Sequence, residues 1–544
     1  IQFCSQEAPE TTRVIKLPLM SSDKSEGVIY KTNCIPPVKL FWALGWSSFL
    51  SGMDMSIVTT ALPAMTKDLN TTEAIADYVG IAYMIGLAAF STVAGKIGDR
   101  FGTVIVHRIG MFCFIVFSAC CGIPWSIYSV IVFRAFQGLA AALLLSNNLA
   151  LVAHLCTHDG MQTAMILNTL FLSAASALGP IIGGLLTEYL GWEYAFFINI
   201  PFGIIGLVAC WMILPPVKKI IDSKFDIGGA IGIFVSLGVV VFGISYIEYS
   251  ALIGIIVLIA GIGLFSLVLL YEAHHETPAL PIPLLVNRTI VSSLIGATIT
   301  FGAQACLLYQ MPFLLQDTFD LTPTESGLCM LPMTIFMIVS AFLAGGLCRK
   351  YISFYTRAFS CVIQCIGLII LGLLCHTGVF AIICIMSFIS IGLGGFQTSN
   401  TGFVTSAAPK NVRGVVGGLV QTFREVGFAM GTSLSACLLD EFLNLEGASS
   451  SDHTFDQMID ASSWVYFVFS LISLCSVLAA FISKASPHEI NLIGHPQYDP
   501  FAKPRIGVEN IELNWKKYKM SIKDRQEETV ALLGEEEEEE EEEF

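Results

Sequence analysis

Long apolar runs alternate with short polar connections from about residue 38 to residue 484. A helix rises 1.5 Å per residue, so about 20 apolar residues are needed to cross the hydrocarbon core of a bilayer. Fourteen runs meet that length approximately: 40–62, 79–95, 104–122, 128–151, 162–186, 198–215, 227–246, 251–271, 290–314, 327–347, 355–375, 379–402, 415–439 and 463–483. The pattern predicts an all-α integral membrane protein with fourteen transmembrane helices.

Composition supports this interpretation. Of the 544 residues, 54% are hydrophobic and only 13% are charged, which excludes an ordinary soluble multidomain protein. The net charge of −15 owes much to residues 535–543, which are all Glu and predict a solvated, disordered acidic tail. No nucleophile–base arrangement and no Cys/His cluster with metal-ligand spacing stands out. We therefore expect no enzymatic activity, no metal, no cofactor and no nucleic-acid partner.

The distribution of Lys and Arg tests the number of spans independently. If both termini are cytoplasmic, the predicted outer loops hold one basic residue, Lys67. The predicted inner loops hold twelve: Lys96, Arg100, Arg108, Lys218, Lys219, Lys224, Arg288, Arg349, Lys350, Arg357, Lys410 and Arg413. This bias is what the positive-inside rule requires, and one missed span would destroy it.

The regions outside the spans suggest a location. The first 36 residues are too polar for a secretory signal peptide. We expect the plasma membrane; residues 498–501 and 528–533 fit tyrosine and dileucine sorting patterns, which leaves a vacuolar or lysosomal membrane as the alternative. Asn70, followed by Thr71 and Thr72, forms a possible glycosylation site in a predicted outer loop.

Landmarks recur along the chain at nearly constant offsets. The pairs are "AGKIGDRFG" from Ala94 with "AGGLCRKYI" from Ala344, "ALGP" from Ala177 with "AMGT" from Ala429, and Pro63 with Pro312. Because they agree in offset and in position within a span, they predict two six-helix bundles with an inserted helix pair.

The predicted organisation has five parts. A cytoplasmic N-terminal tail covers 1–37, the N-terminal bundle 38–217, the inserted pair 218–275, the C-terminal bundle 276–484 and the acidic cytoplasmic tail 485–544. A pathway for a small molecule is expected between the bundles, near the middle of the membrane. We expect the protein to be a monomer.

Ionisable residues inside the spans are the main candidates for chemistry, because each costs about 2.5–3.5 kcal/mol to insert. Asp54 lies in the first span, on one face with Ser51, and that face is expected to border a cavity. Arg134 shares a face of the fourth span with Gln137 and Asn148. Asp54 and Arg134 lie at similar depths on antiparallel helices, so we expect them to meet. Beside Arg134, Asp54 would take up and release a proton as the cavity fills with water and empties. The alternative is a purely structural ion pair.

Arg424 is the second such candidate. It precedes Glu425 in the thirteenth span, and neighbouring helical residues point about 100° apart, so one of the two is expected to face the pathway. We expect this to be Arg424. A structural role is the alternative.

The connection between the second and third spans contains Gly95, Asp99, Arg100 and Gly102. Glycines permit a tight turn, and Asp99 is suited to bind the N-terminus of a neighbouring helix. A contact that locks one conformation is expected here, and an ordinary charged hairpin is the alternative.

The fifth span contains "SALGPIIGG", in which Ala175, Gly179 and Gly183 form one small face and Pro180 and Gly184 belong to another. Small faces let helices approach closely, and proline bends a helix. We expect a hinge at the joint between the two halves. Tight packing alone is the alternative.

These stretches, in this order, resemble the major facilitator superfamily and in particular its 14-span drug:proton antiporter family. The resemblance rests on "GMDMSIVTTALP", "GKIGDRFG", "RAFQGLAAA", "ALGPIIGG", "GWEYAFFINIP" and "FDIGG". It implies that Asp54 is a proton or cation site, Arg134 the proton-relay arginine, Asp99 and Arg100 locking residues, and Gly179 with Pro180 a hinge associated with export. Thr103, Ala175 and Glu193 depart from the family pattern.

The resemblance implies export of small organic molecules, cationic or amphipathic, driven by the proton gradient. Two alternatives remain: a proton symporter or facilitator for a small metabolite, and a non-transporting receptor on the same fold. The lipid bilayer, protons and a small-molecule substrate are the expected partners.

Overall fold

The computed structural model describes residues 36–156, 158–215, 226–247, 249–275, 278–319, 321, 323–350, 353–408, 412–445 and 455–482. Throughout these residues the regular secondary structure is helical. The first elements are α1 (Pro37–Asp68), α2 (Glu73–Ala76), α3 (Tyr78–Phe101), α4 (Thr103–Cys121), α5 (Ile127–Leu155), α6 (His158–Tyr189), α7 (Tyr194–Phe197) and α8 (Asn199–Ile213). Next come α9 (Ile227–Tyr246), α10 (Ala251–His274), α11 (Ile282–Val286), α12 (Arg288–Phe313) and the short π-helix η1 (Leu314–Thr318). The last are α13 (Pro323–Lys350), α14 (Ser353–Leu374), η2 (Cys375–Thr377), α15 (Val379–Ala407), α16 (Arg413–Leu445) and α17 (Phe455–Ile482). The predicted tails, apart from Pro36 and Pro37, lie outside the described residues.

Each predicted span falls in one of the long helices, and twelve of the described helices are long and apolar enough to cross a membrane. Helices α1 and α6 are 32 residues long but are not among the twelve. In α1, inward polar residues such as Ser47 and Asp54 lower the mean hydropathy of the segment. Fourteen crossings therefore remain a prediction.

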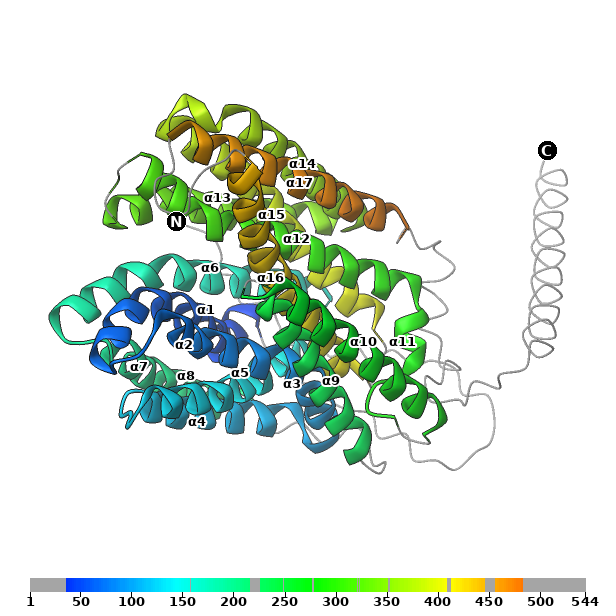
Figure 1. The fold of residues 1–544 in the computed structure, drawn as a ribbon. Coiled ribbons are helices and arrows are strands. Elements are labelled where there is room, and N and C mark those ends of the chain that lie inside the picture. Colours follow the sequence, from blue (N-terminus) through cyan, green and yellow to red (C-terminus); the bar gives the residue numbers. More distant parts are fainter. Residues whose placement is uncertain are drawn as a thin grey trace, which may run out of the picture.

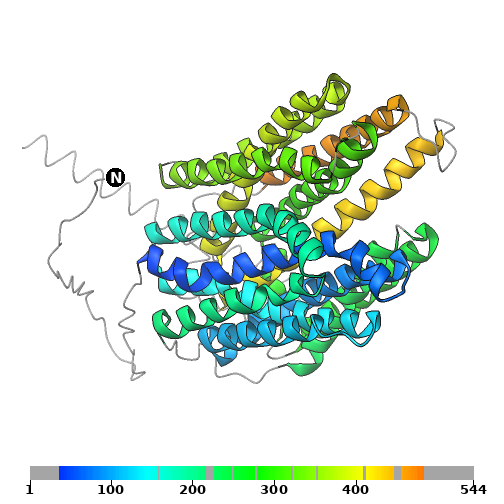
Figure 2. The same cartoon turned by 90° about the vertical axis from the view of Figure 1, so that its left-hand side faces the viewer.

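The long helices form two sets of six, with two further helices beside them (Figures 1 and 2). Helices α1, α3, α4, α5, α6 and α8 pack together, and α12 to α17 form the second set. Helices α9 and α10 pair with each other, and α9 contacts α3 and α16, one helix from each set. The predicted domain bounds, with the inserted pair at 218–275, stay a prediction.

The same close crossing occurs once in each set. A Cβ atom on Gly179 of α6 would overlap Ser56 of α1, and one on Gly431 of α16 would overlap the backbone of Gly302 in α12. Such crossings need glycine because the backbones approach too closely for a side chain. Gly431 follows Gly179 by 252 residues, and Gly302 follows Ser56 by nearly the same number. These offsets agree with those of the repeated landmarks.

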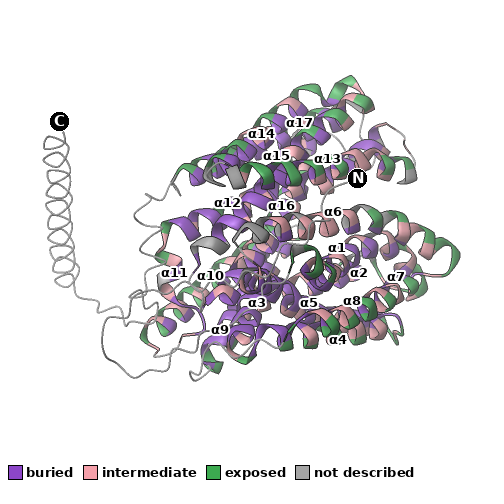
Figure 3. Cartoon of the chain, turned by 180° about the vertical axis from the view of Figure 1, so that it is seen from behind, coloured by how far each residue is buried: buried purple, intermediate pink, exposed green. Residues whose placement is uncertain are grey.

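Exposed residues lie on the outer faces of the helices and buried residues in the interior (Figure 3). Many of the exposed residues are large and apolar. Helix α10 is the clearest case, with Leu252, Ile253, Ile256 and Ile259 all exposed. A soluble monomer rarely exposes contiguous apolar surface of this kind, whereas lipid covers it at no cost. The fold is that of a multi-pass integral membrane protein.

Candidate functional site

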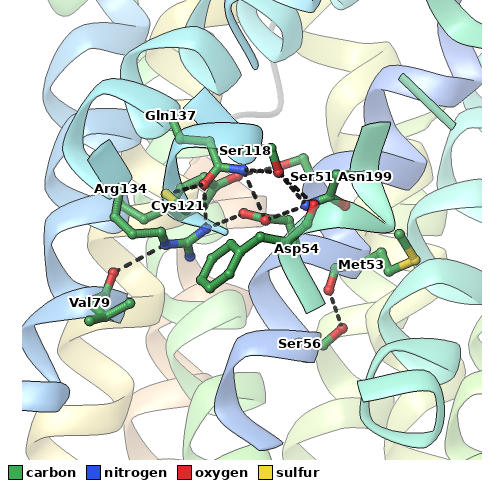
Figure 4. A network of polar contacts seen from close by, with 12 residues as sticks. Ser51, Met53, Asp54, Ser56, Val79, Ser118, Cys121, Arg134, Gln137 and Asn199 are labelled. Carbon is green, nitrogen blue, oxygen red and sulfur yellow. Dashed lines mark hydrogen bonds and ion pairs between the residues drawn. The ribbon is translucent and has the colours of Figure 1, made fainter. Parts of the chain in front are cut away.

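A buried ion pair lies inside the first helix set (Figure 4). Arg134 Nη1 of α5 donates to Asp54 Oδ2 of α1 at 2.5 Å, and both side chains are almost fully buried. The two residues meet as their depths on antiparallel helices predicted. The attraction between the two charges is strong here, because water does not screen a pair that is buried.

Two side-chain amides also bind the carboxylate, and one serine hydroxyl binds both of those amides. Asp54 Oδ1 accepts hydrogen bonds from Gln137 Nε2 at 3.0 Å and from Asn199 Nδ2 of α8 at 2.7 Å. Ser118 Oγ of α4 accepts from the same two amides, at 3.2 and 3.0 Å. Side chains from α5 and α8 therefore hold the carboxylate of α1 in place, with Ser118 of α4 beside them (Figure 4).

Arg134 is held on its other side as well. Its Nε donates to the carbonyl of Val79 at 3.3 Å, and its Nη1 also donates to Gln137 Oε1 at 2.8 Å. The guanidinium lies over the ring of Tyr83, 4.3 Å from the ring centroid, and Tyr83 Oη shares a hydrogen bond with Ser51. Ser51 thus belongs to this network through tyrosine.

The network differs from the expectation in one respect. Asp54 has no exposed surface and does not line the cavity described below. A carboxylate whose two oxygens are both bonded inside a packed bundle needs a movement of α1, α5 or α8 to reach water. Sequence reasoning missed Asn199 and Ser118, although an Asn just before Pro201 in an apolar helix was a usable signal.

Arg424 and Glu425 form a second ion pair, within α16. Arg424 Nε and Nη2 donate to Glu425 Oε1 at 3.1 and 2.9 Å, and Gln421 Nε2 donates to the same oxygen at 2.7 Å. Glu425 is buried, whereas the Arg424 side chain is 18% exposed. Arg424 is therefore the member of the pair that reaches the cavity.

A cavity of about 780 Å³, including its open mouth, lies between the two helix sets. Helices α1, α5 and α6 contribute to it from the first set, and α12, α15 and α16 from the second. Its polar lining residues are Ser48, Asn148, Asn168, Gln397, Thr398, Asn400, Thr401, Gln421 and Arg424. Of the predicted pathway residues, Asn148 and Arg424 line this cavity, whereas Asp54, Ser51, Arg134 and Gln137 lie in the separate network.

The two helix sets are joined where α3 ends and α16 begins. Asp99 Oδ1 accepts from the backbone N–H of Gly414 at 3.0 Å, and Oδ2 accepts from that of Val415 at 3.1 Å. These N–H groups belong to the first turn of α16 and have no partner within their own helix. A carboxylate at this position also interacts favourably with the helix dipole. Asp99 therefore acts as an N-terminal cap supplied by the other set.

Close backbone contact makes this junction tight. A Cβ atom on Gly95 would overlap the Gly414 carbonyl, and Thr92 Oγ1 lies 3.1 Å from Thr422 Oγ1 further along the same two helices. Gly102 has a φ of 105°, which only glycine adopts readily, and joins α3 to α4. Arg100 is half-buried, with its guanidinium 5.5 Å from the ring centroid of Phe101.

We predict that Asp99→Asn loosens this junction while leaving the rest of the fold intact. An amide accepts through only one atom, so at least one cap hydrogen bond is lost, at about 1–3 kcal/mol for a bond to a charged group. Hydrogen–deuterium exchange should rise in the first turns of α16. Asp68→Asn, at the opposite end of the first set, is the matched control. Unchanged protection in α16 would show that Asp99 does not hold the helix.

The small residues of α6 pack within the first set. Ala175, Gly179 and Gly183 are buried, and Cβ atoms on the two glycines would overlap Ser56 and Thr60 of α1. Gly184 faces open space, and the helix runs unbroken through Pro180. Gly179 and Gly183 therefore face α1 of the same half, while α6 also contacts α13 and α15 of the second half. The hinge stays a prediction.

Asn70 lies at the turn between α1 and α2, where it is exposed and has a φ of 47°. Its side chain is accessible to a modifying enzyme in this turn. Glycosylation itself stays a prediction.

The comparisons with known proteins agree with this architecture. A model of the Major Facilitator Superfamily matches residues 44–432. The riboflavin transporter RibZ of Clostridioides difficile is 26% identical over 81% of this chain and 97% of its own length. A tetracenomycin C resistance and export protein of Streptomyces glaucescens is 29% identical over 71% of this chain and 73% of its own. Among solved structures, the proton:xylose symporter XylE matches the fold with a TM-score of 0.59 at 11% identity, over 81% of this chain and 94% of that one.

Proposed function

The chain belongs to the Major Facilitator Superfamily and is therefore a multi-pass membrane transporter rather than an enzyme, and from this premise we propose that it exports small organic molecules in exchange for protons. The observation that carries the coupling is the Asp54–Arg134 pair, buried beside the substrate pathway. A carboxylate is the side chain best suited to hold a proton in one conformation and release it in another.

The proposed cycle alternates two arrangements of the helix sets. In the arrangement seen here, Asp54 is bound by Arg134, Gln137 and Asn199 and is closed to water. Movement of α1 or α8 would remove donors from the carboxylate and let a proton bind in their place. Because Ser51 and Tyr83 connect this shell to α1 and α3, the protonation state and the helix positions are linked.

Export is the proposed direction. Support comes from the tetracenomycin C relative, whose name states export, and from the glycine-dependent crossing of α6 on α1. Both termini are proposed to be cytoplasmic, which places the α3–α16 junction on the cytoplasmic side. The distribution of Lys and Arg supports this orientation. The plasma membrane is the proposed location.

Flux into proteoliposomes with an imposed pH gradient tests the proposal. Riboflavin and tetracenomycin C are suitable first probes, because they are the compounds named for two relatives. Antiport predicts accumulation when the lumen is acidic, since protons leave as the compound enters. Accumulation with an acidic exterior would instead establish symport, and flux indifferent to either gradient would exclude proton coupling.

A further inference from the structure

The charged lining of the cavity between the helix sets is positive. Among its described lining residues, Arg424 is the one charged side chain, and no carboxylate lines it. Asp54, the acidic residue that suggested a cationic substrate, lies outside the lining. A cation entering this cavity would meet a guanidinium and no counter-charge, at a large cost in desolvation.

Arg424 offers the cavity part of its guanidinium. Its Nε and Nη2 are used on Glu425, while its Nη1 makes no hydrogen bond within the described part of the chain. Glu425 lies behind it and does not line the cavity. The pair is neutral overall, and its positive end faces the cavity, so an oxyanion can approach Arg424 without displacing Glu425.

Two residues that line the cavity each have a buried acceptor without a partner among the described residues. The two atoms are Asn148 Oδ1 and Thr398 Oγ1. Asn148 is fixed by its Nδ2, which donates to Ser48 Oγ and to Asn168 Oδ1, both at 3.0 Å. An unpaired buried acceptor is costly, so a ligand that donates to it gains affinity.

Aromatic rings from two helices of the second set line the cavity. They are Phe301 of α12 and Phe396 of α15, and the Phe301 ring centroid lies 5.8 Å from the Arg424 guanidinium. Rings beside a guanidinium suit a flat aromatic molecule whose charged substituent points at the arginine.

We propose that this cavity selects aromatic compounds that carry an oxyanion, such as aromatic carboxylates, together with a hydrogen-bond donor. The proposal rests on the transport function proposed above, because it takes the cavity as the place where the transported molecule binds. Arg424 Nη1 binds the oxyanion, and Asn148 and Thr398 accept from the donor. Export of an anion in exchange for a proton is also favoured by a membrane potential that is negative inside.

Equilibrium dialysis against the purified full-length protein tests this selectivity without requiring flux. The probes are two sets of three compounds, one set built on hydroxylated naphthalene and one on hydroxylated anthracene. Within a set the three compounds differ only in one substituent, which is a carboxylate, a carboxamide or an aminomethyl group. We expect the carboxylates to bind the unmodified protein about tenfold or more tighter than the ammonium compounds, as a hydrogen bond to a charged group allows. The proposal would be overturned if the ammonium compounds bound more tightly than the carboxylates, or if the protein bound none of the carboxylates.

Variants locate the selectivity. Arg424→Gln should weaken carboxylate binding about tenfold and change carboxamide binding less than twofold, and Arg424→Lys should retain most of the preference. Arg288→Gln, which removes the same charge from the exposed start of α12, is the matched control and should change nothing. Equal weakening of all three members by Arg424→Gln would assign Arg424 a structural role. Selective binding with no flux would overturn the transport proposal and leave this one standing.

Discussion

Replacing Asp54 by asparagine is expected to reduce transport driven by a pH gradient to background. Asparagine has nearly the same shape as aspartate but cannot bind and release a proton in the physiological pH range. The variant also leaves the Arg134 guanidinium buried without its counter-charge. Removal of one partner of a buried ion pair costs about 3–5 kcal/mol. Flux in proteoliposomes and the thermal unfolding midpoint measure the two effects.

The loss of stability and the loss of coupling are separable. The double variant Asp54→Asn with Arg134→Gln removes both charges, so it should regain much of the stability that the single variant loses. Its gradient-driven flux should stay at background, because the proton site is still absent. Gradient-driven flux at the unmodified level in either variant would place the proton site elsewhere in the protein.

Gly179→Leu is expected to abolish transport through a different physical cause. A side chain at this position overlaps Ser56, so α6 must move away from α1 along the crossing. Overpacking of a well-packed interface typically costs about 1–3 kcal/mol, which is compatible with insertion into the membrane. Flux and the amount of folded protein after purification are the measurements.

Gly184→Leu is the matched control, since the same substitution five residues later meets open space. We expect it to retain transport. If Gly179→Leu transports normally, the close approach of α6 and α1 is not required; if both variants are inactive, the cause is a property of the helix rather than this crossing.

The helices and the central ion pair were predictable because each depends on a local pattern. Apolar runs of fixed length set the positions of the spans, and the depth of Asp54 and Arg134 follows from counting residues along two antiparallel helices. The apolarity of α1 was harder to judge. Its polar residues, such as Ser47 and Asp54, are buried in the interior, and hydropathy cannot distinguish an inward polar face from a helix that lies outside the membrane.

The lateral arrangement of the helices was not predictable in the same way. Asn199 binds Asp54, and Ser118 binds Asn199, from helices whose neighbours only the packed structure defines. For the same reason, a polar face on α1 did not reveal whether Asp54 borders a cavity or a closed network. The glycine face of α6 likewise showed that a close crossing exists, but not that the partner is α1.

Asp99 was predicted to bind a helix N-terminus, and the structure supplies the helix, α16. No sequence pattern links residues 99 and 414 across 315 positions. Arg424 and Glu425 show the opposite case. Their helical positions predicted that one of the two faces the cavity, because 100° of rotation is a property of one helix alone, but not which one.

The most direct test of proton-coupled export follows the proton itself. Proteoliposomes carry a pH-sensitive dye in the lumen, and no pH gradient is imposed. Tetracenomycin C, or a carboxylate that binds in the dialysis experiment, is added outside. Protein-free liposomes are the control. Exchange predicts that the lumen becomes more alkaline as the compound enters, and that Asp54→Asn removes this response. Acidification of the lumen, or entry of the compound with no pH change above the control, would contradict the account.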